Sequence, residues 1–306
     1  MSKVWSISVP GSTANLGPGF DSIGLALGLY LKLDVSLQEK WSFVHHSEHL
    51  PAEVIVEEHL IYKVAQQVAA QYEVALPTCK VEMYSELPLA RGLGSSASAI
   101  VAAIELVNVV CDLQLSAYDK CVLASEIEGH PDNASASVCG GLTIGATLPN
   151  GELHLLNEKN LDACFAVFIP DVELKTSEAR KALPNSYDKA YAVHGSSYAN
   201  LLTAALLKHD YALAGKFMEA DLFHEPFRAK LIPNYELIRK LAKDYGAYGT
   251  AISGAGPTVI SLIHPSKVAN FVKTMQQHLP SYDIKAVSID SLGVQTTVHT
   301  TNTSAK

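Results

Sequence analysis

The stretch from residue 92 to residue 104 contains no charged side chain and begins G-L-G-S-S, and the apolar pattern of a helix continues to residue 110. A helix without a polar face is typical of a domain core, so residues 95–110 should be buried. The glycines before it let the backbone approach a ligand closely, and the free N–H groups of a helix N-terminus favour an anion. We therefore expect a phosphate-binding loop, although an N-capping serine after a glycine turn would explain the same residues.

The spacing around this loop excludes two common nucleotide-binding motifs. No lysine precedes the serines, so the stretch is not the ordinary P-loop G-x-x-x-x-G-K-[ST], and it is not G-x-G-x-x-G after a strand. Two further stretches are rich in glycine: P-G-S-T-A-N-L-G-P-G-F-D-S-I-G at 10–24 and S-G-A-G-P-T at 253–258. The first carries Asn15 and Asp21, whose amide and carboxylate could hold a polar substrate. Taken alone, it is better explained as a loop with Asx-turns, and the second as a hairpin loop.

Hydrophobic periodicity predicts a mixed α and β fold with no internal repeat. In the first half it indicates strands at 5–9, 31–37 and 79–85, helices at 60–72, 95–110 and 116–128, a turn at H-P-D-N (130–133) and then a strand at G-G-L-T-I-G (140–145). The glycines and prolines of residues 10–24 argue against a long central strand there.

A second unit is predicted to begin near Leu161. Its elements are strands at 163–169, 247–253, 258–263 and 284–289, a helical region at 187–222 broken near Asp210, a helix beginning P-N-Y-E, and a helix at 265–279. Without the extra helices this is the β-α-β-β-α-β order of ferredoxin-like domains.

Charge and cysteine content exclude several classes of function. The net charge is −8 and no Lys/Arg cluster is present, so nucleic acid is an unexpected partner. The uncharged run is too short to cross a membrane and the first residues lack a basic and then apolar leader, so we expect no membrane partner and a cytoplasmic protein. The five cysteines are odd in number and never form C-x-x-C, which indicates thiols in a reducing compartment.

Read together, the three glycine-rich stretches resemble motifs one, two and three of the GHMP kinases, the small-molecule kinases named for galactose, homoserine, mevalonate and phosphomevalonate. They occur in the family's order, and the resemblance extends from about residue 4 to residue 290. Three further stretches are similar to the homoserine branch: E-I-E-G-H-P-D-N at 126–133, L-K-T-S-E-A-R-K-A-L-P at 174–184 and H-E-P-F-R at 224–228.

The resemblance implies a fold and a reaction. The fold is α+β with two domains: an ATP-binding domain at 1–160 like the second domain of ribosomal protein S5, and a ferredoxin-like domain at 161–306. The implied reaction is ATP-dependent phosphorylation of the side-chain hydroxyl of L-homoserine, in threonine biosynthesis, by a homodimer. Two alternatives stay open: a GHMP kinase for another small alcohol, or a relative that binds ligands without turnover.

Roles for individual residues also follow from the resemblance. Arg180 and Arg228 match the arginines that bind the substrate carboxylate, and Asp21 matches the ligand of its ammonium group. The remaining substrate positions are Asn15, His130, Asn133 and Thr176. Without the family context, the arginines would be explained by surface ion pairs, Thr176 by a helix cap and His130 by a structural role.

ATP is implied to lie along motif two, and Mg²⁺ to accompany it. The motif-two residues are Pro88, Leu89, Ala90, Arg91, Gly92, Leu93, Gly94, Ser95, Ser96, Ala97 and Ser98. Ser96 and Glu128 match the magnesium ligands, with Glu126 as the competitor for the second position. With Asn133 they form the catalytic set. Because Asn133 stands where some relatives place an aspartate base, we expect that no side chain fully deprotonates the substrate.

The chain departs from the pattern of the homoserine branch at two places. The branch usually continues D-N-V-A-P-A, whereas residues 132–137 read D-N-A-S-A-S, and His59 stands where an asparagine often precedes the adenine-side Leu-Ile. A nearby group of His45, His46, Glu48 and His49 resembles a metal cluster. Since no matching ligand set accompanies it, a solvated loop is the preferred interpretation.

Overall fold

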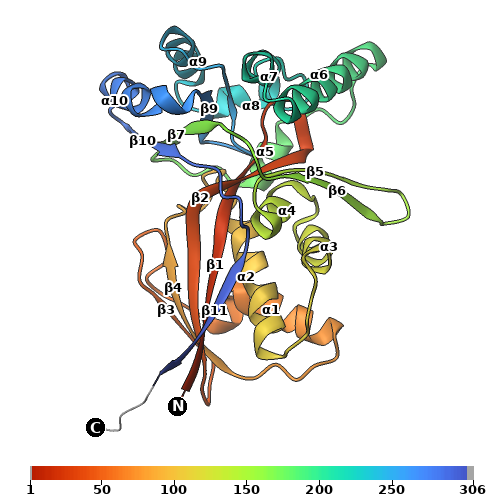
Figure 1. The fold of residues 1–306 in the computed structure, drawn as a ribbon, viewed down its shortest axis with the longest axis vertical. Coiled ribbons are helices and arrows are strands. Elements are labelled where there is room, and N and C mark those ends of the chain that lie inside the picture. The colour runs from red at the N-terminus through yellow and green to blue at the C-terminus, as the bar shows by residue number, and fades with distance from the viewer. Residues whose placement is uncertain (1, 302–306) are drawn as a thin grey trace.

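Two sheets, one in each half of the molecule, organise the chain in the computed structural model, which describes residues 2–301 (Figure 1). Residue 1 and residues 302–306, at the outer ends of the two predicted units, lie outside the described residues. The first sheet has the order β11-β1-β2-β4-β3, and β5 and β6 branch from β2. Its strands are β1 (Ser2–Asn15), β2 (Gly19–Leu37), β3 (Ser42–His45), β4 (Cys79–Ser85), β5 (Leu142–Thr147), β6 (Leu153–Glu158) and β11 (Gln295–Thr301).

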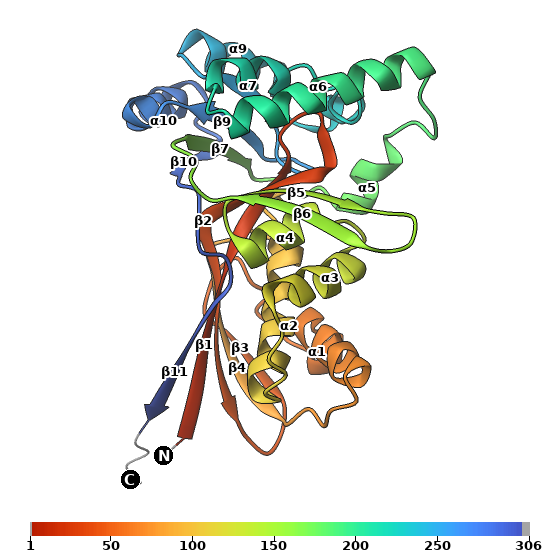
Figure 2. The same ribbon diagram turned by 45° about the vertical axis from the view of Figure 1, so that its right-hand side comes forward.

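Four helices cover one face of the first sheet (Figures 1 and 2). They are α1 (Leu60–Gln71), α2 (Ser95–Val110), α3 (Ala117–Glu128) and α4 (Asp132–Cys139), and a short 3-10 turn, η1 (Val56–Glu58), precedes α1. The predictions of helices at 60–72, 95–110 and 116–128 are confirmed. Helix α2 lies among the other three and is buried continuously over residues 100–107, as its apolar pattern predicts.

The predicted loop at residues 10–24 is wrong, because β1 and β2 run through most of it and only residues 16–18 turn between them. Register shifts at Pro10/Gly11 and Ala14/Asn15 absorb the residues that a regular strand would not accept. The glycines serve close packing instead: a Cβ on Gly24 would lie 2.0 Å from the carbonyl oxygen of Asp132, at the start of α4.

Helix α4 begins within the predicted turn H-P-D-N and was not predicted, whereas the strand predicted at G-G-L-T-I-G, residues 140–145, is confirmed as β5. Residues 134–137 read A-S-A-S and are fully buried against β1 and β2, where larger side chains would not fit. These small residues give no apolar stripe at the i, i+3, i+4 spacing that marks a helix in sequence, which is why the pattern did not reveal one.

The second sheet has the strand order β10-β7-β9-β8 with every pair antiparallel, which confirms the predicted ferredoxin-like order. Its strands are β7 (Cys164–Pro170), β8 (Gly249–Ile252), β9 (Val259–Ile263) and β10 (Tyr282–Val287). The helices of this half are α5 (Thr176–Lys181), α6 (Lys189–Leu207), α7 (Tyr211–Met218), α8 (Glu225–Arg228), α9 (Tyr235–Asp244) and α10 (Val268–His278), with 3-10 turns η2 (Ala229–Leu231) and η3 (Pro265–Lys267). The predicted break near Asp210 is also present, and the Asp210 carboxylate caps α7.

The two halves are joined by more than one crossing of the chain. After β10, strand β11 returns to the first sheet and pairs with β1 along its whole length, so the predicted range 161–306 for the second unit needs correction at its end. The tip of the β1–β2 hairpin reaches the other way, and Gly17 packs against the backbone of Met218 in α7. Within residues 2–301, no helix is long and apolar enough to cross a bilayer.

Candidate active site

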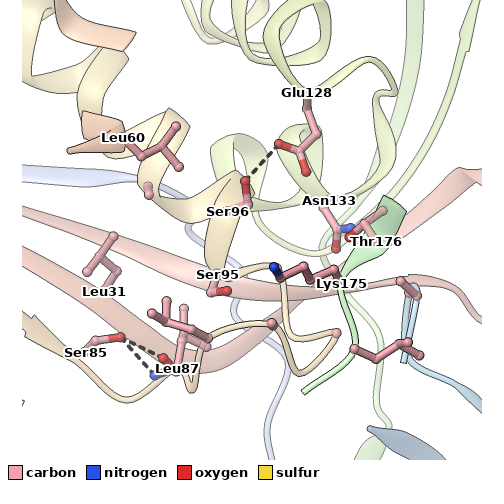
Figure 3. A pocket seen from close by; sticks show the side chains of 18 of the residues that line it. Leu31, Leu60, Ser85, Leu87, Ser95, Ser96, Glu128, Asn133, Lys175 and Thr176 are labelled. Carbon is pink, nitrogen blue, oxygen red and sulfur yellow. Dashed lines mark hydrogen bonds between the residues drawn. The ribbon is translucent and has the colours of Figure 1, made fainter. Parts of the chain in front are cut away.

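A cavity of about 700 Å³ is lined by residues of both halves (Figure 3). The first half contributes the loop before α2, the end of α3 and the start of α4, and the second half contributes α5, α8 and the glycines of motif three. All three glycine-rich stretches therefore meet at one place, as expected of a single ligand site.

The three motifs pack together through their glycines. Gly94, in the left-handed conformation with φ of 71°, is the N-cap of α2 and provides no side-chain cap. A Cβ on Gly94 would lie 2.3 Å from Ser12 Oγ of motif one, and a Cβ on Gly92 would lie 2.4 Å from the Ser253 carbonyl oxygen of motif three. The N-capping serine considered for this stretch is thus not observed, and no side chain occupies the N-terminus of α2.

Only part of motif two faces the cavity. Its lining residues are Leu89, Ala90, Gly92, Gly94, Ser95 and Ser96. Leu93, Ala97 and Ser98 are fully buried, and the Ser98 hydroxyl donates to the Pro10 carbonyl oxygen at 3.0 Å. Pro88 does not line the cavity, and Arg91 turns away from it.

Ser96 and Glu128 face each other across the cavity, and the Ser96 hydroxyl donates to Glu128 Oε2 at 3.4 Å (Figure 3). Burial raises the pKa of the Glu128 carboxyl, and the charge of Asp132 adds to that increase. Glu126 is exposed and does not line the cavity, so the geometry favours Glu128 of the two candidates. A hydroxyl and a carboxylate oxygen are the donor types that Mg²⁺ prefers.

Asp21 and Arg180 form a bidentate ion pair, with N–O distances of 3.0 and 2.8 Å, although they come from opposite halves. The hydrogen bonds that Arg180 donates to the Asp21 carboxylate raise the pKa of Arg180. The ring of Phe20 lies between Arg180 and Arg228, at 5.7 and 5.2 Å from their guanidinium carbons. Two cations and one carboxylate thus share one end of the cavity.

Arg228 is 2% exposed and is held by neutral acceptors. It donates to the carbonyl oxygens of Ala179 and Gly254 and approaches the ring of His224 at 3.4 Å. Burial lowers its pKa to about 10, with a contribution from Arg180. A buried cation without a carboxylate partner is a strong attractor for an anionic group.

Asn15 differs from the other predicted substrate residues because its amide is already engaged. It donates to the Gly254 carbonyl oxygen and accepts from the backbone N–H of Asp21, both at 3.0 Å, and is 2% exposed. Asn15 and Asp21 both have positive φ, which asparagine and aspartate tolerate better than most residues. The geometry indicates that Asn15 holds motifs one and three together and positions Asp21.

The other three predicted residues line the same cavity: His130 lies between α3 and α4, Asn133 in the first turn of α4, and Thr176 at the start of α5. His130 Nδ1 lies 2.6 Å from Asp132 Oδ1; burial opposes protonation of this imidazole, but Asp132, Asp21 and Glu128 together raise its pKa. Asn133 Oδ1 accepts from the buried hydroxyl of Ser12 at 3.0 Å. Thr176 is the first residue of α5 rather than its cap, and it lies beside Asn133 (Figure 3).

The sequence patterns missed one part of the lining. An apolar wall contains Leu31, Leu50, Val54, Ile55, Leu60 and Leu87, and Lys175 lines the opposite side. The wall residues lie on strands, loops and a helix that are spread along the sequence, so no single motif contains them. Several of them precede the Leu-Ile at the start of α1. An apolar wall beside a phosphate loop is suited to a flat base.

His59 takes the cap position of α1. Its Nδ1 accepts from the Ile61 N–H at 3.2 Å, its ring stacks on Phe43 with centroids 3.9 Å apart, and its Nε2 lies 3.3 Å from His45 Nε2. Both histidines line the cavity. Within residues 2–301, the group of His, Cys, Asp or Glu side chains close enough to share a metal is Asp21, His130 and Asp132.

The environment of His59 predicts an acid-sensitive fold. Burial, together with the charge of His45, lowers the pKa of His59 from 6.5 to about 4. The unfolded chain therefore binds a proton at His59 more readily than the folded chain does. The contribution of neutral His59 to the free energy of unfolding is fully present above pH 6.5 and is lost as the pH falls toward 4. If His59 were fully buried, its protonation would lower the free energy of unfolding by about 3 kcal/mol. Because the side chain is partly exposed, we expect a decrease of about 1–2 kcal/mol.

An H59N variant should remove this loss, because asparagine can cap α1 but does not titrate. Urea unfolding at pH 7.5 and pH 5 measures it: the free energy of unfolding should fall less for H59N than for the wild type. The control is H154N, at an exposed histidine of β6. Equal pH dependence of H59N and wild type would contradict the prediction.

Comparison with known proteins places this geometry in context. The model of the GHMP kinases N terminal domain matches residues 59–141, and the model of the GHMP kinases C terminal domain matches residues 202–281. The chain is 47% identical over 290 residues to the homoserine kinase of Bacillus velezensis, covering 95% of this chain and 94% of that one. It is also 47% identical over 292 residues to that of Oceanobacillus iheyensis, covering 95% and 98%.

Solved structures agree with the sequence relatives. A structure from Listeria monocytogenes, assigned as a homoserine kinase, has a TM-score of 0.83 at 37% identity and covers 96% of this chain and 99% of its own. A homoserine kinase structure from Cytophaga hutchinsonii has a TM-score of 0.83 at 24% identity, with coverage of 96% and 97%, and shares the fold.

Proposed function

The chain belongs to the GHMP kinase family, and from this premise we infer that it catalyses ATP-dependent phosphorylation of L-homoserine to O-phospho-L-homoserine in threonine biosynthesis. Identity of 47% to homoserine kinases over 95% of the chain carries this conclusion. The chain is therefore an enzyme, a phosphotransferase that uses an alcohol group as acceptor.

We propose that the ion pair between Asp21 and Arg180 opens to admit the substrate. An amino acid carries both a carboxylate and an ammonium group, so it can offer Arg180 a new anion and Asp21 a new cation at once. Arg228 is the second guanidinium within reach of the carboxylate. A sugar or a mevalonate-type alcohol lacks the ammonium group and would leave Asp21 unpaired, which argues against the alternative acceptors.

For the nucleotide, we propose that the phosphates lie at the N-terminus of α2 and the base on the apolar wall. The Ser96 hydroxyl and the Glu128 carboxylate fit a divalent cation, because both oxygens face the same cavity at 3.4 Å from each other. Bound there, Mg²⁺ would neutralise charge on the phosphates. The presence of both proposed magnesium ligands, Ser96 and Glu128, argues against a relative that binds ATP and substrate without catalysing the reaction.

We propose further that no residue of the site acts as a strong general base. The Asn133 amide cannot accept a proton, and its oxygen is already bonded to Ser12. His130 Nδ1 is already engaged by Asp132 Oδ1 at 2.6 Å. Transfer would depend mainly on positioning of the hydroxyl and neutralisation of the phosphates, as suits a loose transition state.

We propose that the protein is cytoplasmic and forms a homodimer, as the family resemblance implies. All five cysteines are thiols in the structure, the state that a reducing cytoplasm maintains. We propose a homodimer on the family resemblance alone, and size-exclusion chromatography with light scattering would test it.

The first experiment is ADP release by the purified protein with Mg·ATP and a panel of acceptors: L-homoserine, L-serine, L-threonine, mevalonate and galactose. We expect turnover that strongly favours L-homoserine, because the longer side chain of homoserine brings its hydroxyl to the phosphate end while both charges stay paired. Preference for mevalonate or galactose would support the other-alcohol alternative. ATP binding without turnover on any acceptor would support the ligand-sensing one.

A further inference from the structure

The loop that holds the nucleotide phosphates has no cation of its own to offer them. Arg91 is the one lysine or arginine in residues 88–98, and its side chain points away from the cavity. It donates to the Pro170 carbonyl oxygen at 3.1 Å and pairs with Glu173 at 3.4 Å and Asp171 at 3.7 Å. Since the motif also lacks a P-loop lysine, any side-chain cation for the phosphates has to come from another segment.

The contacts of Arg91 place such a segment opposite the loop. In addition to the contacts of the Arg91 side chain, the Leu174 N–H donates a backbone hydrogen bond to the Ala90 carbonyl oxygen of the loop at 3.1 Å. Leu174 is 9% exposed, so its position is fixed by packing as well as by hydrogen bonding. Lys175, the next residue, therefore starts from an anchored backbone at the edge of the cavity.

Lys175 then extends into the cavity. It is the N-cap residue of α5, but its side chain forms no capping hydrogen bond. Instead the side chain points toward Ser95, the first residue of α2 (Figure 3). Lys175, Ser95 and Ser96 line the same cavity. Within residues 2–301, the lysine forms no ion pair with a carboxylate.

The other cations of the cavity are engaged elsewhere. Arg180 is paired with Asp21, and Arg228 is buried among carbonyl oxygens at the substrate end. Among the described residues that line the cavity, Lys175 is the remaining lysine or arginine. On the opposite side, Glu128 adds negative charge, which increases the need for a cation at the phosphates.

We propose that Lys175 supplies the cation that binds the terminal phosphates of ATP and stabilises the phosphoryl group during transfer. The inference rests on the proposed function, because it assumes that ATP lies along this loop. A flexible lysine acts as a point charge, so its contribution should be largest where negative charge is concentrated, on the β- and γ-phosphates.

The test compares K175M with K175R and with K181M, a change at an exposed lysine of α5 that does not line the cavity. We expect K175M to reduce kcat by about 10- to 100-fold while KM for L-homoserine changes by less than about two-fold. K175R, which retains the charge, should recover most of the rate, and K181M should behave like the wild type.

A binding measurement separates this inference from the proposed function. Calorimetric titration should show that K175M weakens binding of a non-hydrolysable ATP analogue with Mg²⁺ by about 10-fold and binding of Mg·ADP by less. Unchanged kcat and unchanged analogue affinity would overturn the inference, as would an increase confined to KM for L-homoserine. If the wild type failed to phosphorylate L-homoserine, the proposed function would fall, while the analogue titration would still decide the role of Lys175.

Discussion

Replacing Arg180 with leucine should lower kcat/KM for L-homoserine by about 10²- to 10³-fold. The variant loses the guanidinium that we propose binds the substrate carboxylate and leaves Asp21 without its ion pair, and breaking one side of such a pair costs about 3–4 kcal/mol. Because the carboxylate is held before and during transfer, we expect much of the loss in KM. Initial rates of ADP release over a range of L-homoserine concentrations measure both constants.

Two variants complete this test. K181L, at the exposed neighbour of Arg180, should retain wild-type constants, which excludes a general effect on α5. The affinity of R180L for ATP should also be unchanged, because Arg180 lies at the substrate end of the cavity. An R180L variant with a wild-type kcat/KM would show that Arg228 alone holds the carboxylate.

The second large effect is expected at Glu128. An E128Q variant should lose about 10³-fold in kcat, since a neutral amide is a poor ligand for Mg²⁺ and the charge that the cation brings is worth several kcal/mol in the transition state. The Mg²⁺ concentration for half-maximal rate should increase as well. Steady-state rates over a magnesium titration at saturating ATP and L-homoserine provide the measurement.

Glu126 provides the matched comparison. It lies two residues away on the same helix but is exposed and outside the cavity, so E126Q should keep its rate and its magnesium requirement. The reverse result, with E126Q impaired and E128Q active, would assign the metal to Glu126 and contradict the geometry of Ser96 and Glu128.

The fold was predictable where the hydrophobic pattern is strong and not where packing replaces it. Helix α2 and the four strands of the second sheet follow directly from their apolar runs. Helix α4 and the part of the β1–β2 hairpin within residues 10–24 were missed because many of their buried residues are glycine, alanine and serine, whose role depends on what packs against them. A sequence pattern records side-chain polarity, whereas the fit of Gly24 under Asp132 depends on two segments distant in the chain.

The candidate site shows the same division. The motifs brought Ser96, Asp21 and Arg180 to one cavity in the prediction, and the structure places them there. The sequence did not reveal that the Asn15 amide is occupied by hydrogen bonds within the protein, or that the Arg91 side chain points away from the cavity. Both facts depend on partners supplied by another part of the fold, and no local spacing specifies them.

The return of β11 to β1 has a consequence for the way this protein is made. Residues 295–301 leave the ribosome after the whole ferredoxin-like sheet, yet they are the partners of β1, one of the first strands to be synthesised. Until then the outer edge of β1 has unpaired N–H and C=O groups and is open to other strands. Translation of the last strand therefore closes the first sheet, and a nascent chain stalled before residue 295 would present an aggregation-prone edge.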